Sequence, residues 1–377
     1  MGKYKRQALF RNMNTNKTAH FDLVDILRAF AALTVVVYHT IIICGWQDFP
    51  TTYPLAWFRY GWMGVDIFFV ISGFVITWSA LNMQEKSGGK NIFFSFMKNR
   101  LRRIVPLHYL TMALFILLFP AIVYPDFLYD LLAHVFFVHN WFPEYHGTIN
   151  GINWSLGAEM QFYVLLALTV GFLNFRTLKI FIFGALAITF LWRLYTVVSL
   201  PVGSENFAML RFICATELPG MLDLFAAGIG LAFFARTPMF GRLAGSTIGK
   251  ATVFLAFCAI MSVALWIFER RMDYWKFDRM VIFFRTILAL AFGLLLLFFC
   301  LIKPGPRIKL FLSPLLYLGT ISYGIYLFHL PVVLKTKDLD MAPGWKLALI
   351  LIITISLAAL SWHFYEKRFL IKYRRKN

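Results

Sequence analysis

The sequence predicts an all-α, polytopic membrane protein built as a bundle of about ten transmembrane helices. Of its 377 residues, 60% are hydrophobic and only 15% are charged. Apolar runs recur from residue 22 to residue 366, and most approach the roughly 20 residues that cross a bilayer as a helix. The formal net charge of +19 falls mainly in short basic clusters between these runs. Basic loops of this kind set membrane topology, so we expect no nucleic-acid binding.

The expected elements follow from the order of the apolar runs. The stretch 128–141 is apolar but too short to cross, and we expect a re-entrant or interfacial helix there. An even number of spans, together with the basic clusters, predicts that both termini are cytoplasmic. Residues 1–21 and 367–377 are then basic tails around a membrane domain, 22–366. The predicted spans are 22–44, 60–82, 104–124, 153–173, 178–198, 217–235, 251–268, 280–302, 312–334 and 345–366.

The first span carries two ionisable side chains, Arg28 and His39. An ionisable group near the centre of a span costs at least ~2.5 kcal/mol, so its presence favours a function. Eleven residues make about three helical turns, which places both side chains on one face, about 16 Å apart along the axis. The predicted topology puts Arg28 near the cytoplasm and His39 in the outer third. Asp25 lies one turn before Arg28, so an ion pair is the structural alternative for that arginine.

Glu159 enters the fourth span from the outside and reaches a depth similar to that of His39. A carboxylate at this depth could orient the imidazole ring and leave its other nitrogen as a general base. The alternative is a structural polar pair that fixes helix packing. We therefore predict His39 and Glu159 as catalytic residues.

A basic cluster leads directly into the third span. Arg100 and Arg103 lie one turn apart on one helical face, and guanidinium groups suit phosphate oxygens. Basic residues also collect at any inner helix end, next to lipid headgroups. Together with Arg28, however, the cluster predicts a cytoplasmic pocket for a phosphate-bearing ligand.

The remaining polar residues within spans suggest structural roles. Asp66 and Asp223 could each pair with an intramembrane arginine. Glycines of the run 226–230 suit close helix approach better than a phosphate loop. The four cysteines show no metal-binding or redox spacing, and we expect neither a metal site nor a permanently bound cofactor.

Several motifs together resemble the integral-membrane acyltransferase family 3, best known as bacterial O-acetyltransferases of cell-surface glycans. The resemblance covers essentially the whole chain. It rests on five blocks in order: Arg28 with His39; Gly64–Phe74; Phe96, Arg100, Arg103, Pro106 and Tyr109; Trp154–Tyr163; and Ile321–His329.

The resemblance implies a multi-pass protein of the bacterial inner (plasma) membrane and an O-acyltransferase activity. The donor would be a cytoplasmic acyl-CoA, usually acetyl-CoA, bound as a substrate with help from Arg28, Arg100 and Arg103. The acceptor would be a hydroxyl of a cell-surface or lipid-linked glycan, with His39 as base or acyl relay. Some members carry an esterase-like domain after the membrane core. Because this sequence ends soon after its last span, we expect acylation without that domain.

Several alternatives stay open on the sequence alone. His39 could activate the acceptor hydroxyl directly, or it could first accept the acyl group. Acetyl and succinyl donors, several glycan acceptors and the oligomeric state are undecided. Intramembrane His, Glu, Asp and Arg also suit a proton-coupled secondary transporter, although the matching broken spans typical of that class are absent from the sequence. A purely structural membrane protein is the third reading.

Overall fold

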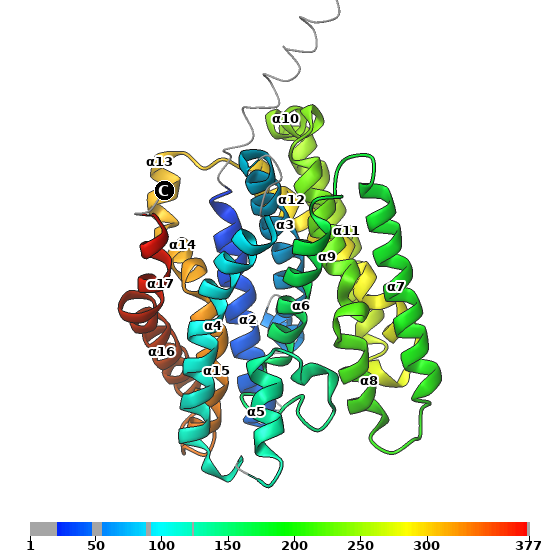
Figure 1. Ribbon diagram of the computed structural model, residues 1–377. Coiled ribbons are helices and arrows are strands. Elements are labelled where there is room, and N and C mark those ends of the chain that lie inside the picture. Colours follow the sequence, from blue (N-terminus) through cyan, green and yellow to red (C-terminus); the bar gives the residue numbers. More distant parts are fainter. Residues whose placement is uncertain (1–20, 47–54, 88–91, 123, 375–377) are drawn as a thin grey trace, which may run out of the picture. The chain divides into compact units, whose positions relative to one another are not determined.

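A computed structural model describes residues 21–46, 55–87, 92–122 and 124–374 (Figure 1). Within these ranges the chain is helical and contains no β-strand. Its α-helices are α2 (Leu23–Ile43), α3 (Met63–Ser87), α4 (Ile92–Leu118), α5 (Phe127–Val135), α6 (Trp154–Thr169), α7 (Leu178–Ser199), α8 (Phe207–Thr216), α9 (Leu218–Phe234), α10 (Pro238–Gly245), α11 (Thr247–Glu269), α12 (Arg285–Leu301), α13 (Pro306–Phe311), α14 (Ser313–Thr320), α15 (Ser322–Thr336), α16 (Pro343–Ser361) and α17 (Lys367–Arg374).

Short helices of other types connect these elements. Two π-helical turns, η5 (Met280–Phe284) and η6 (Trp362–Glu366), continue into α12 and α17. The 3-10 helices are η1 (Leu55–Tyr60), η2 (Pro120–Ile122), η3 (His139–Trp141) and η4 (Tyr274–Lys276).

The predicted spans coincide with helices, but their number is not settled at ten. Among the residues that the structure describes, seven helices are long and apolar enough to cross a membrane, and two bent pairs raise the number to nine if each pair is one span. The pairs are α8 with α9, bent by 45°, and α14 with α15, bent by 70°. The predicted span 153–173 corresponds to α6, which has 16 residues. At 1.5 Å per residue, α6 is about 24 Å long, shorter than a typical hydrocarbon core.

The apolar stretch 128–141 does not form one helix of spanning length. It contains α5, with nine residues, followed by turns and the three-residue η3. The predicted third span also begins earlier than expected, since α4 already starts at Ile92 and includes the basic cluster.

The chain divides into two compact units, and the divisions fall within α2, α3 and α6 and after the first residue of α4 and of α14. Unit 1 comprises Met1–Leu27, Phe69–Ile92 and Leu165–Ser313, and unit 2 comprises Arg28–Phe68, Phe93–Val164 and Pro314–Asn377.

Unit 1 is held together by close helix packing and one buried ion pair. Figure 1 shows α7 beside α9, and α11 packs along α12. A Cβ atom at Gly228 of α9 would collide with the Val70 carbonyl of α3, which confirms that this glycine permits close approach. Arg193 of α7 pairs with Asp223 of α9 at 2.9 Å, and both side chains are fully buried. Asp223 is therefore the structural partner of an intramembrane arginine, as predicted.

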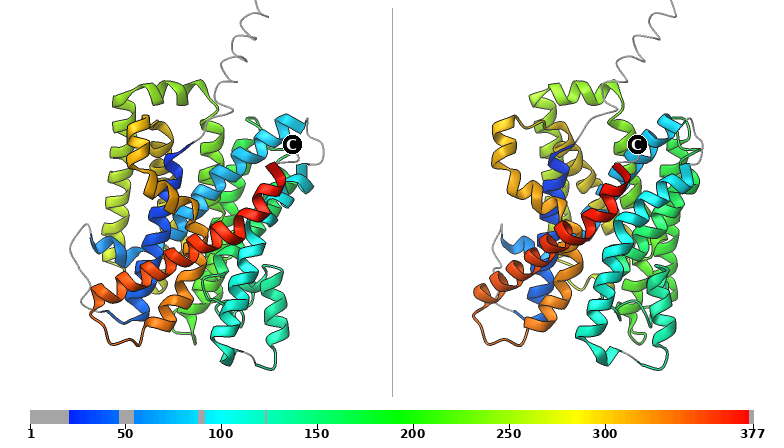
Figure 2. Two further views of the ribbon diagram at one scale, coloured as in Figure 1. Left: turned by 90° about the vertical axis from the view of Figure 1, so that its left-hand side faces the viewer. Right: turned by 60° about the vertical axis from the view of Figure 1, so that its left-hand side comes forward.

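Unit 2 contains α15 packed along α16, with α5 beside the C-terminal half of α4 (Figure 2). The ring of His108 on α4 approaches the His134 carbonyl of α5 at 3.3 Å, and the Tyr109 hydroxyl donates to the Val135 carbonyl at 2.9 Å. Every residue predicted for the site lies in this unit.

Candidate active site

Two histidines from distant parts of the sequence meet in unit 2. Nδ1 of His39 on α2 lies 3.0 Å from Nε2 of His329 on α15. The two rings are stacked, with centroids 5.0 Å apart and planes inclined by 30°. His329 is fully buried, whereas His39 is partly exposed, so a substrate can reach only the His39 side of the pair.

The hydrogen bonds of the pair define which nitrogen is available for chemistry. Nδ1 of His329 contacts the Tyr326 carbonyl, which can only accept, so this nitrogen carries a proton. Nε2 of neutral His329 is then an acceptor, and His39 must donate to it from Nδ1. In neutral His39, Nε2 therefore carries the free lone pair. This is the arrangement that a general base requires.

One face of α6 supports this pair with polar side chains spaced one turn apart. The Ser155 hydroxyl lies 2.7 Å from the Tyr326 hydroxyl, which donates to the Ile152 carbonyl at 3.0 Å. Glu159 follows Ser155 by about one helical turn and Tyr163 follows it by about two, and the Tyr163 hydroxyl donates to the Glu159 carboxylate. Residues four apart share a helical face, so the Trp154–Tyr163 motif places Ser155, Glu159 and Tyr163 in one column.

The three predicted donor-binding arginines also converge in unit 2. Arg28 of α2 is within electrostatic range of both Arg100 and Arg103 of α4, and the like charges repel. Nη2 of Arg103 donates to the Thr320 carbonyl at 3.4 Å, and its guanidinium lies 5.1 Å from the Trp362 ring centre. All three arginines are partly exposed. Such a cluster of accessible guanidinium groups suits an anion with several oxygens.

The break between α14 and α15 adds a helix terminus to the arginine cluster. The chain bends by 70° there, and α15 begins at Ser322, two residues after the Thr320 carbonyl that Arg103 contacts. No side chain caps the N-terminus of α15. The Tyr323 hydroxyl donates to the Ile104 carbonyl of α4 at 2.9 Å and holds this turn against α4. A discontinuous helix inside a membrane protein directs its positive N-terminal end toward anionic groups.

The irregular segment between α5 and α6 is docked onto the turn of α15 that precedes His329. Pro331 has no N–H, so the helix cannot satisfy the Leu327 carbonyl four residues earlier. Nδ2 of Asn150 donates to that carbonyl at 3.1 Å. Asn150 itself is fully buried and has a left-handed backbone, with φ of 56°. The proline and the asparagine together anchor residues 136–153 next to the histidine pair.

The structure places each predicted residue but gives His39 a partner other than the predicted Glu159. His39, Glu159, Arg28, Arg100 and Arg103 all belong to one unit. His39 has His329 as its ring partner, and Glu159 has the Tyr163 hydroxyl as a donor. His329, Tyr323 and Tyr326 were recognised as parts of a motif and not as site residues. Their spacing of three residues, which puts them on neighbouring parts of one helical face, was the signal that could have identified them.

Among the residues that the structure describes, no group of three or more His, Cys, Asp or Glu side chains is placed to bind a metal ion.

Comparison with known proteins is consistent with this geometry. A family model described as an acyltransferase domain matches residues 21–366. A Bacillus subtilis protein named "Putative peptidoglycan O-acetyltransferase YrhL" is 28% identical over 93% of this chain and 56% of its own length. The O-acetyltransferase OatA of Staphylococcus aureus is 28% identical over 91% of this chain and 56% of its own. The peptidoglycan O-acetyltransferase OatA of Listeria monocytogenes is 27% identical over 91% and 54%.

This chain thus spans about half the length of the curated relatives that it matches. No solved structure matches it. The family model covers nearly the whole sequence, and the structure supplies the apolar helices of a multi-pass inner-membrane protein. The chain belongs to the integral-membrane acyltransferase family 3.

Proposed function

We propose that this protein is a membrane O-acetyltransferase that moves an acetyl group from acetyl-CoA to a hydroxyl of a glycan. The observation that carries the proposal is the His39–His329 pair, which leaves Nε2 of a partly exposed histidine as a base. Two of the relatives are named for peptidoglycan, so we take peptidoglycan as the first acceptor to test.

In the proposed reaction His39 acts as a general base. Nε2 removes the proton of the acceptor hydroxyl while the hydroxyl oxygen attacks the thioester carbon. The C–S bond then breaks, and the departing thiolate takes the proton back from His39. His329 is a positioning residue that accepts a hydrogen bond from Nδ1 and so stabilises the imidazolium that forms between the two steps. The orienting role that the sequence suggested for Glu159 is assigned here to His329.

The alternative route begins with attack of Nε2 on the thioester, which yields an acetyl-imidazole. That route needs a second base for the acceptor hydroxyl once His39 is acylated. We favour direct transfer because it uses only the groups that the histidine pair supplies. Rapid quenching after incubation with labelled acetyl-CoA alone distinguishes the routes, since only the relay leaves label on His39.

For the donor, we propose that Arg28, Arg100 and Arg103 bind the phosphates of CoA together with the N-terminus of α15. Arg28 and His39 lie on one helix and are separated by about 16 Å along its axis. An elongated molecule with phosphates at one end and a thioester at the other suits that separation. The partial exposure of all three arginines supports access to such a ligand.

The test is acetyl transfer by purified full-length protein from radiolabelled acetyl-CoA to peptidoglycan fragments. We expect His39→Ala to lower kcat by about 10²–10⁴-fold, the usual contribution of a general base. His329→Leu should lower kcat with little change in KM, and His329→Gln, which keeps an acceptor, should retain more activity. His363→Ala is the matched control, because this histidine is exposed and contacts Tyr317. Undiminished transfer by His39→Ala would overturn the proposal.

The same assay tests the donor site. Arg103→Ala should raise the KM for acetyl-CoA more than it lowers kcat, whereas Lys98→Ala, an exposed cation on the same helix, should change neither. An assay of solute flux in proteoliposomes tests the alternative that the protein is a proton-coupled transporter. Proton-coupled transport without any acetyl transfer to a range of glycans would favour a transporter instead.

A further inference from the structure

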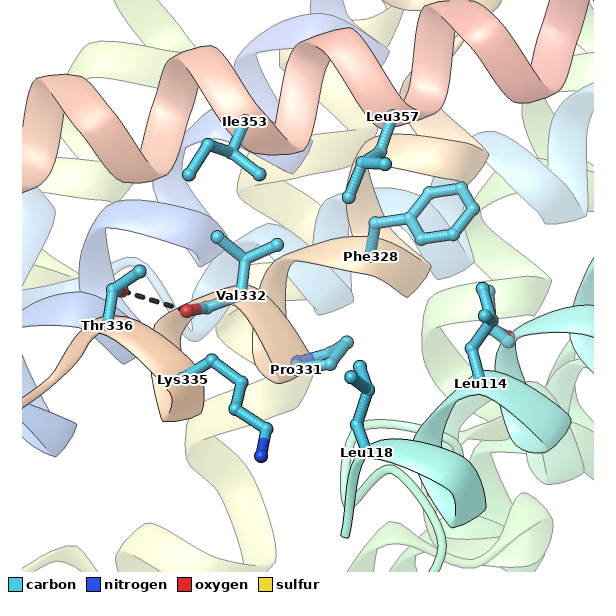
Figure 3. A pocket seen from close by; sticks show the side chains of 10 residues that line it. Leu114, Leu118, Phe328, Pro331, Val332, Lys335, Thr336, Ile353 and Leu357 are labelled. Atoms are coloured by element: carbon cyan, nitrogen blue, oxygen red, sulfur yellow. Dashed lines mark hydrogen bonds between the residues drawn. The ribbon is translucent and has the colours of Figure 1, made fainter.

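A groove in unit 2 is lined neither by the two histidines of the pair nor by the arginines of the cluster. It runs between α4, α15 and α16 and has a volume of about 270 Å³. Figure 3 shows Phe328 and Val332 of α15 opposite Ile353 and Leu357 of α16, with Leu118 of α4 at the remaining side. The walls of the groove are almost entirely hydrocarbon.

The position of the groove determines what surrounds it. α4 and α16 are each long and apolar enough to span a membrane, and α15 qualifies together with α14. Side chains at the rim remain open to the surroundings: Leu118 is 42% exposed and Leu357 is 37% exposed. At membrane depth the surroundings are lipid chains, because apolar side chains and hydrocarbon are the only partners there. A concave apolar surface on such helices is therefore filled by hydrocarbon.

One end of the groove carries a single cation, Lys335. It lies in the last turn of α15, just before the exposed residues 337–342. Its Nζ is 4.6 Å from the centre of the Phe119 ring, and its side chain is exposed. A lysine at the end of a span extends its ammonium to the level of the lipid headgroups. Lys335 therefore places a positive charge where the apolar groove reaches the interface.

The distance between the two features matches an amphiphilic ligand. Seven residues separate Phe328 from Lys335, which is about 10 Å along the helix axis. A molecule with an anionic head at Lys335 would thus run its hydrocarbon chain along Val332 toward Phe328. A neutral head would gain the apolar contact without the charge. The lysine consequently favours a head group with a net negative charge over a zwitterionic one.

We propose that this groove binds one hydrocarbon chain of an anionic phospholipid, whose phosphate contacts Lys335. The lipid is a resident molecule of the bilayer and takes no part in the acetyl transfer. Its binding would stabilise the packing of α15 against α4 and α16. This inference does not depend on the proposed enzymatic activity.

The test is native mass spectrometry of the full-length protein, released from detergent after incubation with equal amounts of dioleoyl-phosphatidylglycerol and dioleoyl-phosphatidylcholine. We expect preferential retention of one phosphatidylglycerol. Lys335→Gln should reduce that retention several-fold, and Lys335→Arg should restore it. Lys337→Gln is the matched control, since this lysine is exposed two residues further on and does not line the groove.

A second pair of variants tests the apolar part. Leu114 lines the groove and is 36% exposed, so Leu114→Trp should fill it and reduce retention of phosphatidylglycerol. Leu117→Trp on the same helix, at a residue 77% exposed and outside the groove, should retain the lipid. Size-exclusion chromatography confirms that each variant is folded. Equal retention of the two lipids, or equal loss in Lys335→Gln and Lys337→Gln, would show a general lipid coat and overturn the proposal.

Discussion

Individual polar residues inside this membrane protein have distinct environments that indicate distinct roles. Arg193 is fully buried, and its guanidinium contacts the Gly220 and Ile282 carbonyls, the Thr286 hydroxyl and Asp223. Arg103, in contrast, is partly exposed, with a long contact of 3.4 Å to the Thr320 carbonyl. A buried guanidinium held by four acceptors has a structural role, whereas an accessible one is able to bind a ligand.

Removing one member of the buried pair in unit 1 should therefore destabilise the protein. We expect Arg193→Met or Asp223→Leu to cost about 3–5 kcal/mol, because each leaves an uncompensated buried charge. The double variant should lose less than the sum of the two single variants. Thermal unfolding in detergent, followed by the fraction of monodisperse protein, measures all three. Additive losses would show that the two charges do not interact.

Burial of His146 leads to a pH-dependent stability at the residue scale. This histidine lies between α5 and α6, where burial lowers its pKa to about 4 from an ordinary value of 6.5. The unfolded chain then binds more protons than the folded one, so stability falls as the pH drops from about 6.5 toward 4. The slope from this group is at most about 1.4 kcal/mol per pH unit.

The measurement is the unfolding midpoint of the wild type and of His146→Gln between pH 7.5 and pH 4.5 under matched conditions. The variant should show a weaker pH dependence over that range. Parallel curves for the two proteins would assign the acid sensitivity to other groups, such as the nearby His139, whose pKa burial also lowers.

At the scale of elements, the breaks within helices leave backbone carbonyls that side chains from other elements satisfy. Pro331 frees the Leu327 carbonyl, and Asn150 satisfies it from a segment that is not helical. The bend at Ile321 likewise leaves the Thr320 carbonyl for Arg103. Each break thus joins α15 to a different neighbour, one next to the histidine pair and one at the arginine cluster.

A double-mutant cycle tests the first of these junctions. Asn150→Gly keeps the positive φ but removes the amide donor, and it should cost about 1–3 kcal/mol because a buried carbonyl loses its partner. Pro331→Ala restores an N–H within α15, so in its presence Asn150→Gly should cost less. Stability of the four proteins by chemical or thermal unfolding gives the coupling. A cost of Asn150→Gly that is independent of residue 331 would contradict this explanation of the junction.

The sequence predicted the elements well and the contacts between them less well. Apolar runs of spanning length identified the long helices, because lipid requires an unbroken hydrophobic surface, but they did not predict the short helices α8, α10, α13 and α17. Length alone could not reveal the bend at Ile321, although Gly319 lies two residues before it. The pairing of His39 with Glu159 was inferred from equal depth in the membrane, and depth does not specify which helices are neighbours. His329 is 290 residues away in the sequence, and only the fold brings it to His39.

At the scale of the whole molecule, the basic clusters and the number of spans together determine orientation. Between seven and nine helices or bent pairs meet the criteria for crossing, and α6 decides whether a tenth crossing exists. The site residues are all within one unit, although they come from four separate helices. The proposed transfer from a cytoplasmic donor to a cell-surface acceptor would depend on this orientation.

Reporter fusions test the orientation. With ten crossings both termini are cytoplasmic, so green fluorescent protein fused after Asn377 should fluoresce, and alkaline phosphatase at that position should be inactive. Alkaline phosphatase inserted after Glu205, between α7 and α8, should be active. Active phosphatase at the C-terminus would indicate an odd number of crossings and would require α6 not to span.

The hydrogen bonds of His329 bear on whether the rate of the proposed reaction depends on the membrane voltage. Its Nδ1 is held by a carbonyl that cannot accept a transferred proton, so the pair offers no path for protons into the interior. The proton that His39 takes from the hydroxyl can return only to the departing thiolate. The reaction then exchanges one hydrogen for one acetyl group, so the charge carried by the donor and the charge carried by the acceptor are both unchanged. No net charge crosses the bilayer, and the rate of transfer should be insensitive to the voltage that the membrane carries.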